Sequence, residues 1–142
     1  NVKKNIKNEK KFGLHKFSTY LKFAKKVKNS KKKLNDIVKK IKQNQGNIIG
    51  YGATAKSCTV LNYCNINYKT IDFFYDTTSY KINKYLPGSK IQIRKYKKLD
   101  LKKKYYVFLG AWNFKDEIFK KERSFIKSGG KFITHIPHPK II

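Results

Sequence analysis

The chain contains no methionine and only two cysteines in 142 residues. Cys58 and Cys64 have no second pair, so the sequence predicts neither a disulfide framework nor a structural zinc site. No apolar run approaches the roughly 18 residues of a membrane span, and residues 1–11 lack the apolar segment of a signal peptide. We therefore expect a cytoplasmic protein with no membrane partner and no bound metal. Because methionine is absent even from position 1, we also expect the chain to belong to a longer one.

Acidic residues are scarce as well. Eight Asp and Glu against 35 Lys and Arg give a formal net charge of +27, which favours anionic partners. Proteins that recognise nucleic acid favour arginine for its bidentate fork, but only Arg94 and Arg123 are arginine here. Residues 1–45 carry a net +14 and residues 46–142 a net +13, so the charge is spread over the chain. The abundant Lys, Asn, Ile, Tyr and Phe are typical of an AT-rich genome. No specific nucleic-acid partner is expected, and a basic nucleic-acid-binding domain is the least favoured alternative.

The length and the 39% of hydrophobic residues suit one folded domain. Apolar residues at spacings of three and four predict an amphipathic helix over residues 17–41, with a break possible at Asn29 and Ser30. Residues 1–45 are thus expected to form a helical lead-in packed on a domain of residues 46–142. In that domain, strands are predicted at 47–51, 71–75, 90–93, 105–109 and 131–136, with helices at 55–65 and 114–127. This alternation predicts an α/β fold with a Rossmann-like, mostly parallel sheet and flanking helices.

A glycine turn follows the first predicted strand. Gly50, Gly52 and Ala55 satisfy the pattern G-x-G-x-x-G/A, and Asp76 ends the next strand. Such a turn aims backbone N–H groups at an anion beside a helix N-terminus, and Lys56 adds a cation. The pattern favours phosphate or diphosphate binding, with a purely structural turn as the alternative. Asp76 either accepts hydrogen bonds from a sugar hydroxyl or caps the following turn.

Further candidates lie where the other strands end, because open α/β sheets bind ligands at the carboxyl ends of their strands. Trp112 and Asn113 follow the fourth strand, where a core residue and a helix cap are the alternative roles. His135 is the best placed of the three histidines, although a structural role is the simpler interpretation. No nucleophile, base and orienting group can be assembled by spacing, so no catalytic residue is predicted in the chain.

Six blocks of sequence carry a resemblance to a known family. They include IGYGATAK at 49–56, YLPG at 85–88 and AWNFKDEI at 111–118, and the others fall at 61–64, 71–76 and 129–137. In this order, over residues 46–137, they resemble the C-terminal domain of sugar C-methyltransferases that use S-adenosyl-methionine. The preceding helix is similar to the lead-in of that family.

The resemblance implies an enzyme of three parts. These are a zinc-binding N-terminal domain, a central domain that binds S-adenosyl-methionine, and a Rossmann-like C-terminal domain that helps to hold a nucleotide-diphosphate sugar. The implied reaction transfers a methyl group to a sugar carbon next to a keto group. This chain lacks the zinc cysteines, the methyl-donor glycine motif and an evident base. We therefore expect it to be inactive alone, with the methyl-donor domain of the parent chain and a nucleotide sugar as its partners.

The backbone donors of residues 52–55 and the Lys56 side chain are expected to face the diphosphate, with other residues on the nucleotide or sugar side. The expected substrate-binding residues are Gly50, Tyr51, Gly52, Ala53, Thr54, Ala55, Lys56, Asp76, Lys81, Lys84, Tyr85, Trp112, Asn113 and His135. A dinucleotide-binding module of the NAD type is the main alternative.

Overall fold

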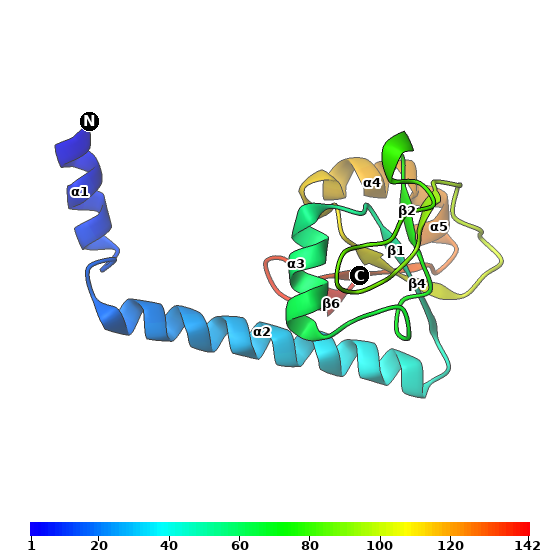
Figure 1. The fold of residues 1–142 in the computed structure, drawn as a ribbon, viewed down its shortest axis with the longest axis horizontal. Coiled ribbons are helices and arrows are strands. Elements are labelled where there is room, and N and C mark those ends of the chain that lie inside the picture. Colours follow the sequence, from blue (N-terminus) through cyan, green and yellow to red (C-terminus); the bar gives the residue numbers. More distant parts are fainter.

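A six-stranded sheet forms the centre of the computed structural model, which describes residues 1–142 (Figure 1). The strands are β1 (Asn47–Tyr51), β2 (Phe74–Asp76), β3 (Ile93–Lys95), β4 (Tyr105–Leu109), β5 (Lys131–Thr134) and β6 (Lys140–Ile141). Their order is β3-β2-β1-β4-β5-β6, and only β6 is antiparallel to its neighbour. This order is that of a doubly wound α/β sheet, which confirms the predicted fold class.

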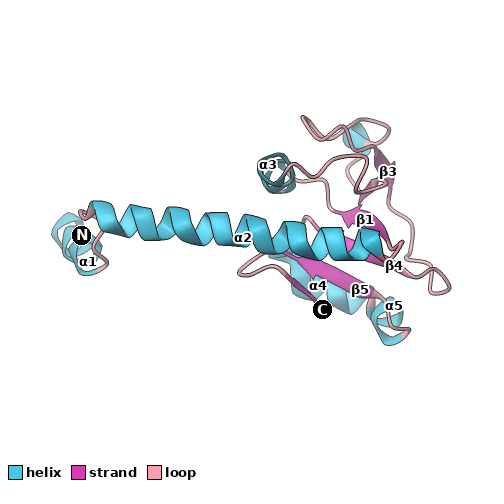
Figure 2. Ribbon diagram, turned by 90° about the horizontal axis from the view of Figure 1, so that it is seen from below, coloured by secondary structure: helices cyan, strands magenta, loops and turns pink.

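Helices cover both faces of the sheet (Figure 2). One face packs against α2 (Phe17–Gln43) and α3 (Ala55–Cys64), and the other against α4 (Lys115–Lys121) and α5 (Arg123–Lys127). A further helix, α1 (Val2–Lys11), precedes α2, and short 3-10 turns occur at Ser79–Lys81 and Trp112–Phe114. No helix combines the length and the apolarity that a membrane crossing needs.

The two central strands are buried on both sides, which explains their continuous apolar runs. In β1, Ile48 packs toward α2 and α3, whereas Ile49 packs toward α4 and α5. In β4, Phe108 faces the first pair of helices and Val107 the second. Side chains of a parallel strand alternate between two covered faces, so no polar positions interrupt the pattern.

The expected break in the long helix is wrong, because α2 continues through Asn29 and Ser30. Each of these residues disfavours a helix by only about half a kcal/mol, which is too little to interrupt a helix anchored by Leu34 and Val38. By contrast, the single helix predicted over 114–127 is divided at Glu122, whose φ of −97° and ψ of 22° end α4 before α5 begins.

Three predicted strands have different bounds. The strand predicted at 71–75 is Phe74–Asp76, the one at 90–93 is Ile93–Lys95, and the last ends at Thr134 rather than at residue 136. Helix α1 and strand β6 were not predicted from the sequence.

Only the last part of the helical lead-in packs on the sheet. The buried residues of α2 are Leu34, Val38 and Ile41, and no residue before Leu34 is buried. As a result, α1 and the first half of α2 extend away from the rest of the fold (Figures 1 and 2).

Candidate functional site

A cavity of about 410 Å³ opens at the carboxyl ends of β1 and β2. The loops after β1 and β4 both line it, through Gly52 and Thr54 and through Ala111 and Phe114. The chain leaves β1 toward β2 but leaves β4 toward β5, so the winding of the sheet reverses between β1 and β4. Open α/β sheets bind their ligands at this point. The other lining residues are Tyr51, Tyr75, Asp76, Thr77, Thr78, Lys81, Tyr96, Glu117, Ile118 and Lys121.

The two glycines of the turn are required by close packing. Gly52 has a φ of +82°, and a Cβ on it would lie 2.4 Å from the Cβ of Ala111. A Cβ on Gly50 would lie 2.2 Å from the ring of Phe74. Both contacts are too short for any other residue, so the glycine spacing has a structural explanation whether or not a ligand binds.

The first amides of the turn are bonded within the chain. The N–H groups of Gly52, Ala53 and Thr54 donate to Tyr75 O, Asp76 Oδ2 and Ser57 Oγ at 2.8, 2.8 and 2.9 Å. The N–H groups of Ala55 and Lys56, in the first turn of α3, have no partner. A diphosphate at this turn therefore meets two free amides, not the whole run from Gly52 to Ala55 expected from the sequence.

Asp76 is the anion that the turn holds in this structure. Its Oδ2 accepts from Ala53 N and its Oδ1 from Thr78 N, each at 2.8 Å. The Lys81 Nζ lies 3.7 Å from the carboxylate and donates to Ala53 O at 2.9 Å. Burial alone opposes ionisation, but the bonds from Thr78 and Ala53 and the charge of Lys81 outweigh it and hold the pKa of Asp76 below its usual value. Of the two roles that the sequence left open, the geometry corresponds to the cap.

A buried carboxylate lies beside the cavity wall. Glu122 is only 2% exposed, and its Oε1 accepts from the hydroxyl groups of Tyr51 at 3.2 Å and Tyr96 at 2.5 Å. Burial, followed by the charge of Glu122, raises the pKa of Tyr51 well above its usual value. Burial, followed by the hydrogen bond to Glu122, raises the pKa of Tyr96 to about 12. Both phenols therefore keep their protons at neutral pH.

Sequence reasoning did not find this cluster. The signal that could have found it is helical spacing, because Glu122 lies four residues after Ile118 and three before Phe125, on the same buried side of the predicted helix. The neighbouring Lys121 Nζ lies 3.8 Å from the centre of the Tyr96 ring. Tyr75, Tyr96 and Lys121 are thus lining residues that the sequence did not indicate.

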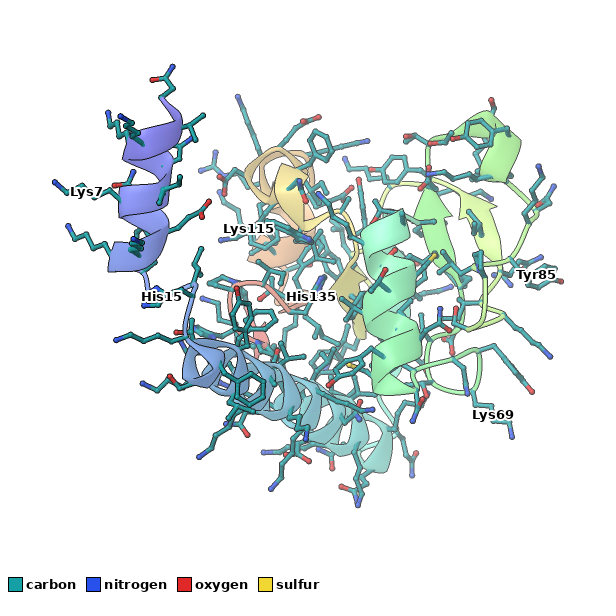
Figure 3. The ribbon with its side chains drawn as sticks, turned by 60° about the vertical axis from the view of Figure 1, so that its left-hand side comes forward. Lys7, His15, Lys69, Tyr85, Lys115 and His135 are labelled. Atoms are coloured by element: carbon teal, nitrogen blue, oxygen red, sulfur yellow. The ribbon has the colours of Figure 1, made fainter.

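Several expected residues lie near the cavity without lining it. The Lys56 Nζ lies 5.1 Å from the centre of the Trp112 ring, within reach of a cation–π interaction. Asn113 is exposed in the 3-10 turn between two lining residues. Lys84 and Tyr85 are also exposed, but they belong to the loop before β3, where Tyr85 points outward (Figure 3).

His135 lies on the opposite face of the sheet from the cavity wall. It is 3% exposed and stacks on Phe108, with ring centres 5.2 Å apart and planes at 1°. Neither ring nitrogen has a hydrogen-bond partner. Burial lowers the pKa of His135 to about 4, so the imidazole is neutral at physiological pH. Figure 3 shows it inside the fold, and the structure does not bring it to the cavity.

The doubly wound order and the cavity at the reversal of winding define a Rossmann-like domain with a candidate ligand cavity. A family model described as "C-methyltransferase C-terminal domain" matches residues 1–137. The chain therefore belongs to the C-methyltransferase C-terminal domain family, which confirms the resemblance found in the sequence.

One curated relative is the C-methyltransferase NovU of Streptomyces niveus. It is 32% identical to this chain over 141 residues, which are 99% of the chain and 34% of NovU. The chain thus spans about a third of the length of this relative.

Proposed function

We propose that this chain is the substrate-side domain of an S-adenosyl-methionine-dependent C-methyltransferase. Its ligand is a nucleotide-diphosphate deoxysugar or a related glycan precursor. The observation that carries the proposal is the position of the cavity, at the reversal of winding and beside the free amides of Ala55 and Lys56. Family membership supplies the reaction class, and the NovU match is to a protein named as a C-methyltransferase.

The lining suits the uncharged parts of such a ligand. Tyr51, Tyr75, Tyr96 and Phe114 offer aromatic surface for a base or a sugar ring. The charges of the lining residues cancel, because the two positive charges of Lys81 and Lys121 equal the two negative charges of Asp76 and Glu117. The interior therefore suits the nucleoside or sugar better than the diphosphate.

The phosphates belong at the first turn of α3. Its two free N–H groups carry the positive end of the helix dipole, and the exposed Lys56 adds a full charge. Thr54 caps this helix and also lines the cavity, so the phosphate position and the cavity are adjacent.

The bonds of Asp76 count against the methyl donor at the turn of this chain. Adenosine-containing cofactors of Rossmann-like folds place a ribose on the acidic residue that ends the second strand. Here each oxygen of that residue, Asp76, already accepts one backbone N–H group, which leaves it fewer lone pairs for a ribose hydroxyl. The same observation disfavours the NAD-type alternative. We assign the donor to another part of the enzyme.

Proton abstraction is likewise assigned elsewhere. The two phenols beside Glu122 donate hydrogen bonds to its carboxylate, and their raised pKa values keep them protonated at neutral pH. The role of this chain is then to bind and orient the substrate, and the isolated chain is inactive.

Isothermal titration calorimetry tests the proposal, with thymidine diphosphate and NAD as probes. Thymidine diphosphate should bind, and Lys56→Ala should weaken it about tenfold, the effect of one lost charged hydrogen bond. Lys69→Ala removes an exposed lysine remote from the cavity and should change nothing (Figure 3). The exposed lining residue Phe114 gives a second variant, Phe114→Ala, which should also weaken binding. Binding of NAD alone, or equal affinities for all variants, would contradict the proposal.

A further inference from the structure

The helical arm formed by α1 and the first half of α2 carries an unusual amount of exposed apolar surface. Phe12, Phe17 and Phe23 are 74%, 76% and 65% exposed, and Tyr20 and Leu21 are more than half exposed. Exposed apolar side chains that gather on one face of an element mark an interaction site when nothing covers them. The arm is nonetheless held in shape by its own contacts, since Tyr20 Oη donates to Leu14 O at 2.7 Å.

One line of these side chains continues the stripe by which α2 packs on the sheet. At about 100° per residue, Tyr20, Phe23 and Val27 project within about 40° of the direction of the buried Leu34. Leu21 projects about 140° away from that direction. We call Tyr20, Phe23 and Val27 the arm stripe. It faces the side of α2 on which the sheet domain lies, and it begins where the domain ends, near the Lys31 Nζ that sits 4.7 Å from the Tyr63 ring centre.

The arrangement of the elements limits what can cover the arm stripe. In Figure 1, α1 and the sheet domain rise on the same side of α2, one at each end, and the corner between α1 and α2 is closed by the bond from Thr19 Oγ1 to Gly13 O. The arm stripe thus lies between α1 and the sheet domain, on the side of α2 from which both rise, and what covers it must fit between these two parts.

We propose that the arm stripe is the docking surface for the part of the polypeptide that precedes this domain in a full-length C-methyltransferase. This inference rests on the proposed function. The family is described as a C-terminal domain, and NovU has about three times the length of this chain, so such a part is available. It joins at α1, next to the arm stripe, and the tether gives it a high effective concentration there.

Charge indicates the chemistry of the docked surface. Lys16, Lys26 and Lys31 flank the arm stripe, and residues 1–45 carry a net charge of +14. A second copy of the arm is repelled by this charge, so self-association through the stripe is opposed. The partner surface is therefore apolar at its centre, where it meets Phe23, and acidic at its rim.

Photo-crosslinking in the complete polypeptide of the source genome tests the docking. The crosslinking residue p-benzoylphenylalanine is placed at position 23, or at position 21 as the matched control on the opposite side of α2. Position 23 should crosslink within one polypeptide to residues that precede Asn1, at least fivefold more than position 21. Equal crosslinking at both positions, no crosslink, or a reading frame that encodes no preceding part would overturn the proposal.

Experiments on the isolated chain test two other occupants of the arm stripe, a second copy of the chain and a membrane. Phe23→Asp and Leu21→Asp replace exposed side chains, so both variants should unfold at the temperature of the parent. The parent should be monomeric in analytical ultracentrifugation and should bind vesicles of equal phosphatidylcholine and phosphatidylserine no better than Phe23→Asp does. A dimer, or vesicle binding lost only in Phe23→Asp, would assign the stripe to a second copy or to a membrane. Thymidine diphosphate binding is unaffected by either outcome, so the proposed function is judged separately.

Discussion

The buried imidazole of His135 predicts a specific loss of stability in mild acid. Its pKa is lowered from 6.5 to about 4 by burial, because nothing near the ring compensates the protonated form. At pH values between about 4 and 6.5, the unfolded chain therefore binds one more proton than the folded chain. Stability from this group is fully present above pH 6.5 and is lost as the pH falls toward 4.

The size of the effect follows from the same two values. The full difference between the two pKa values corresponds to about 3 kcal/mol of folding stability. About 2 kcal/mol of this stability is already lost at pH 5 relative to pH 7.5. The pKa of the Asp76 carboxyl lies below its usual value, so its protonation falls outside this range. His135→Leu keeps the packing against Phe108 without a titrating group, and it also removes two unpartnered buried nitrogens.

Urea unfolding at pH 7.5 and pH 5 measures this difference. His135→Leu should be at least as stable as the parent at pH 7.5, and its advantage should grow by about 2 kcal/mol at pH 5. His138→Leu, at an exposed histidine three residues away, should retain the parent's loss of stability. An advantage of His135→Leu that stays the same at both pH values would refute the reasoning.

Two further substitutions test the glycine turn and the cavity wall. Gly50→Ala puts a Cβ 2.2 Å from the Phe74 ring and should lower the free energy of unfolding by about 3 kcal/mol in urea titrations, whereas an unchanged midpoint would contradict the close packing. Glu122→Gln keeps an acceptor but removes the charge, so ultraviolet titration should find the pKa of Tyr96 below about 12, although burial still raises it. Glu122→Leu leaves two phenols without an acceptor and should cost about 2 kcal/mol more than Glu122→Gln.

The fold was predictable where sequence and tertiary structure agree locally. The first strand, its glycine turn and the cap of α3 follow from a buried apolar run and from Thr54 and Ser57, which satisfy each other's backbone amides. The short strands β2 and β3 were placed one to three residues away, because β3 shows only one buried residue and its limits depend on pairing with β2. Helix α1 buries nothing, so it left no apolar pattern to detect.

The candidate site was predictable only in part. Position at a strand end located Asp76, and the spacing of the glycines located the turn. Helical spacing from Ile118 and Phe125 indicates that Glu122 faces inward, but its partners, Tyr51 and Tyr96, lie 71 and 26 residues away in the sequence. No local pattern identifies partners at such a distance along the chain.

The glycine pattern also shows what a motif leaves undetermined. It specifies a turn that accepts an anion, but the anion can come from the chain itself, and here the Asp76 carboxylate takes the amide of Ala53. In the proposed function a ligand phosphate therefore binds at the next free amides, those of Ala55 and Lys56, while the charges that line the cavity balance one another. The net charge of +27 attracts anions to the protein in general, and salt at physiological concentration screens this attraction beyond about 8 Å. In the proposed function, selectivity among anionic metabolites then comes from the aromatic wall around Tyr96, so the base or the sugar, and not the diphosphate, distinguishes one substrate from another.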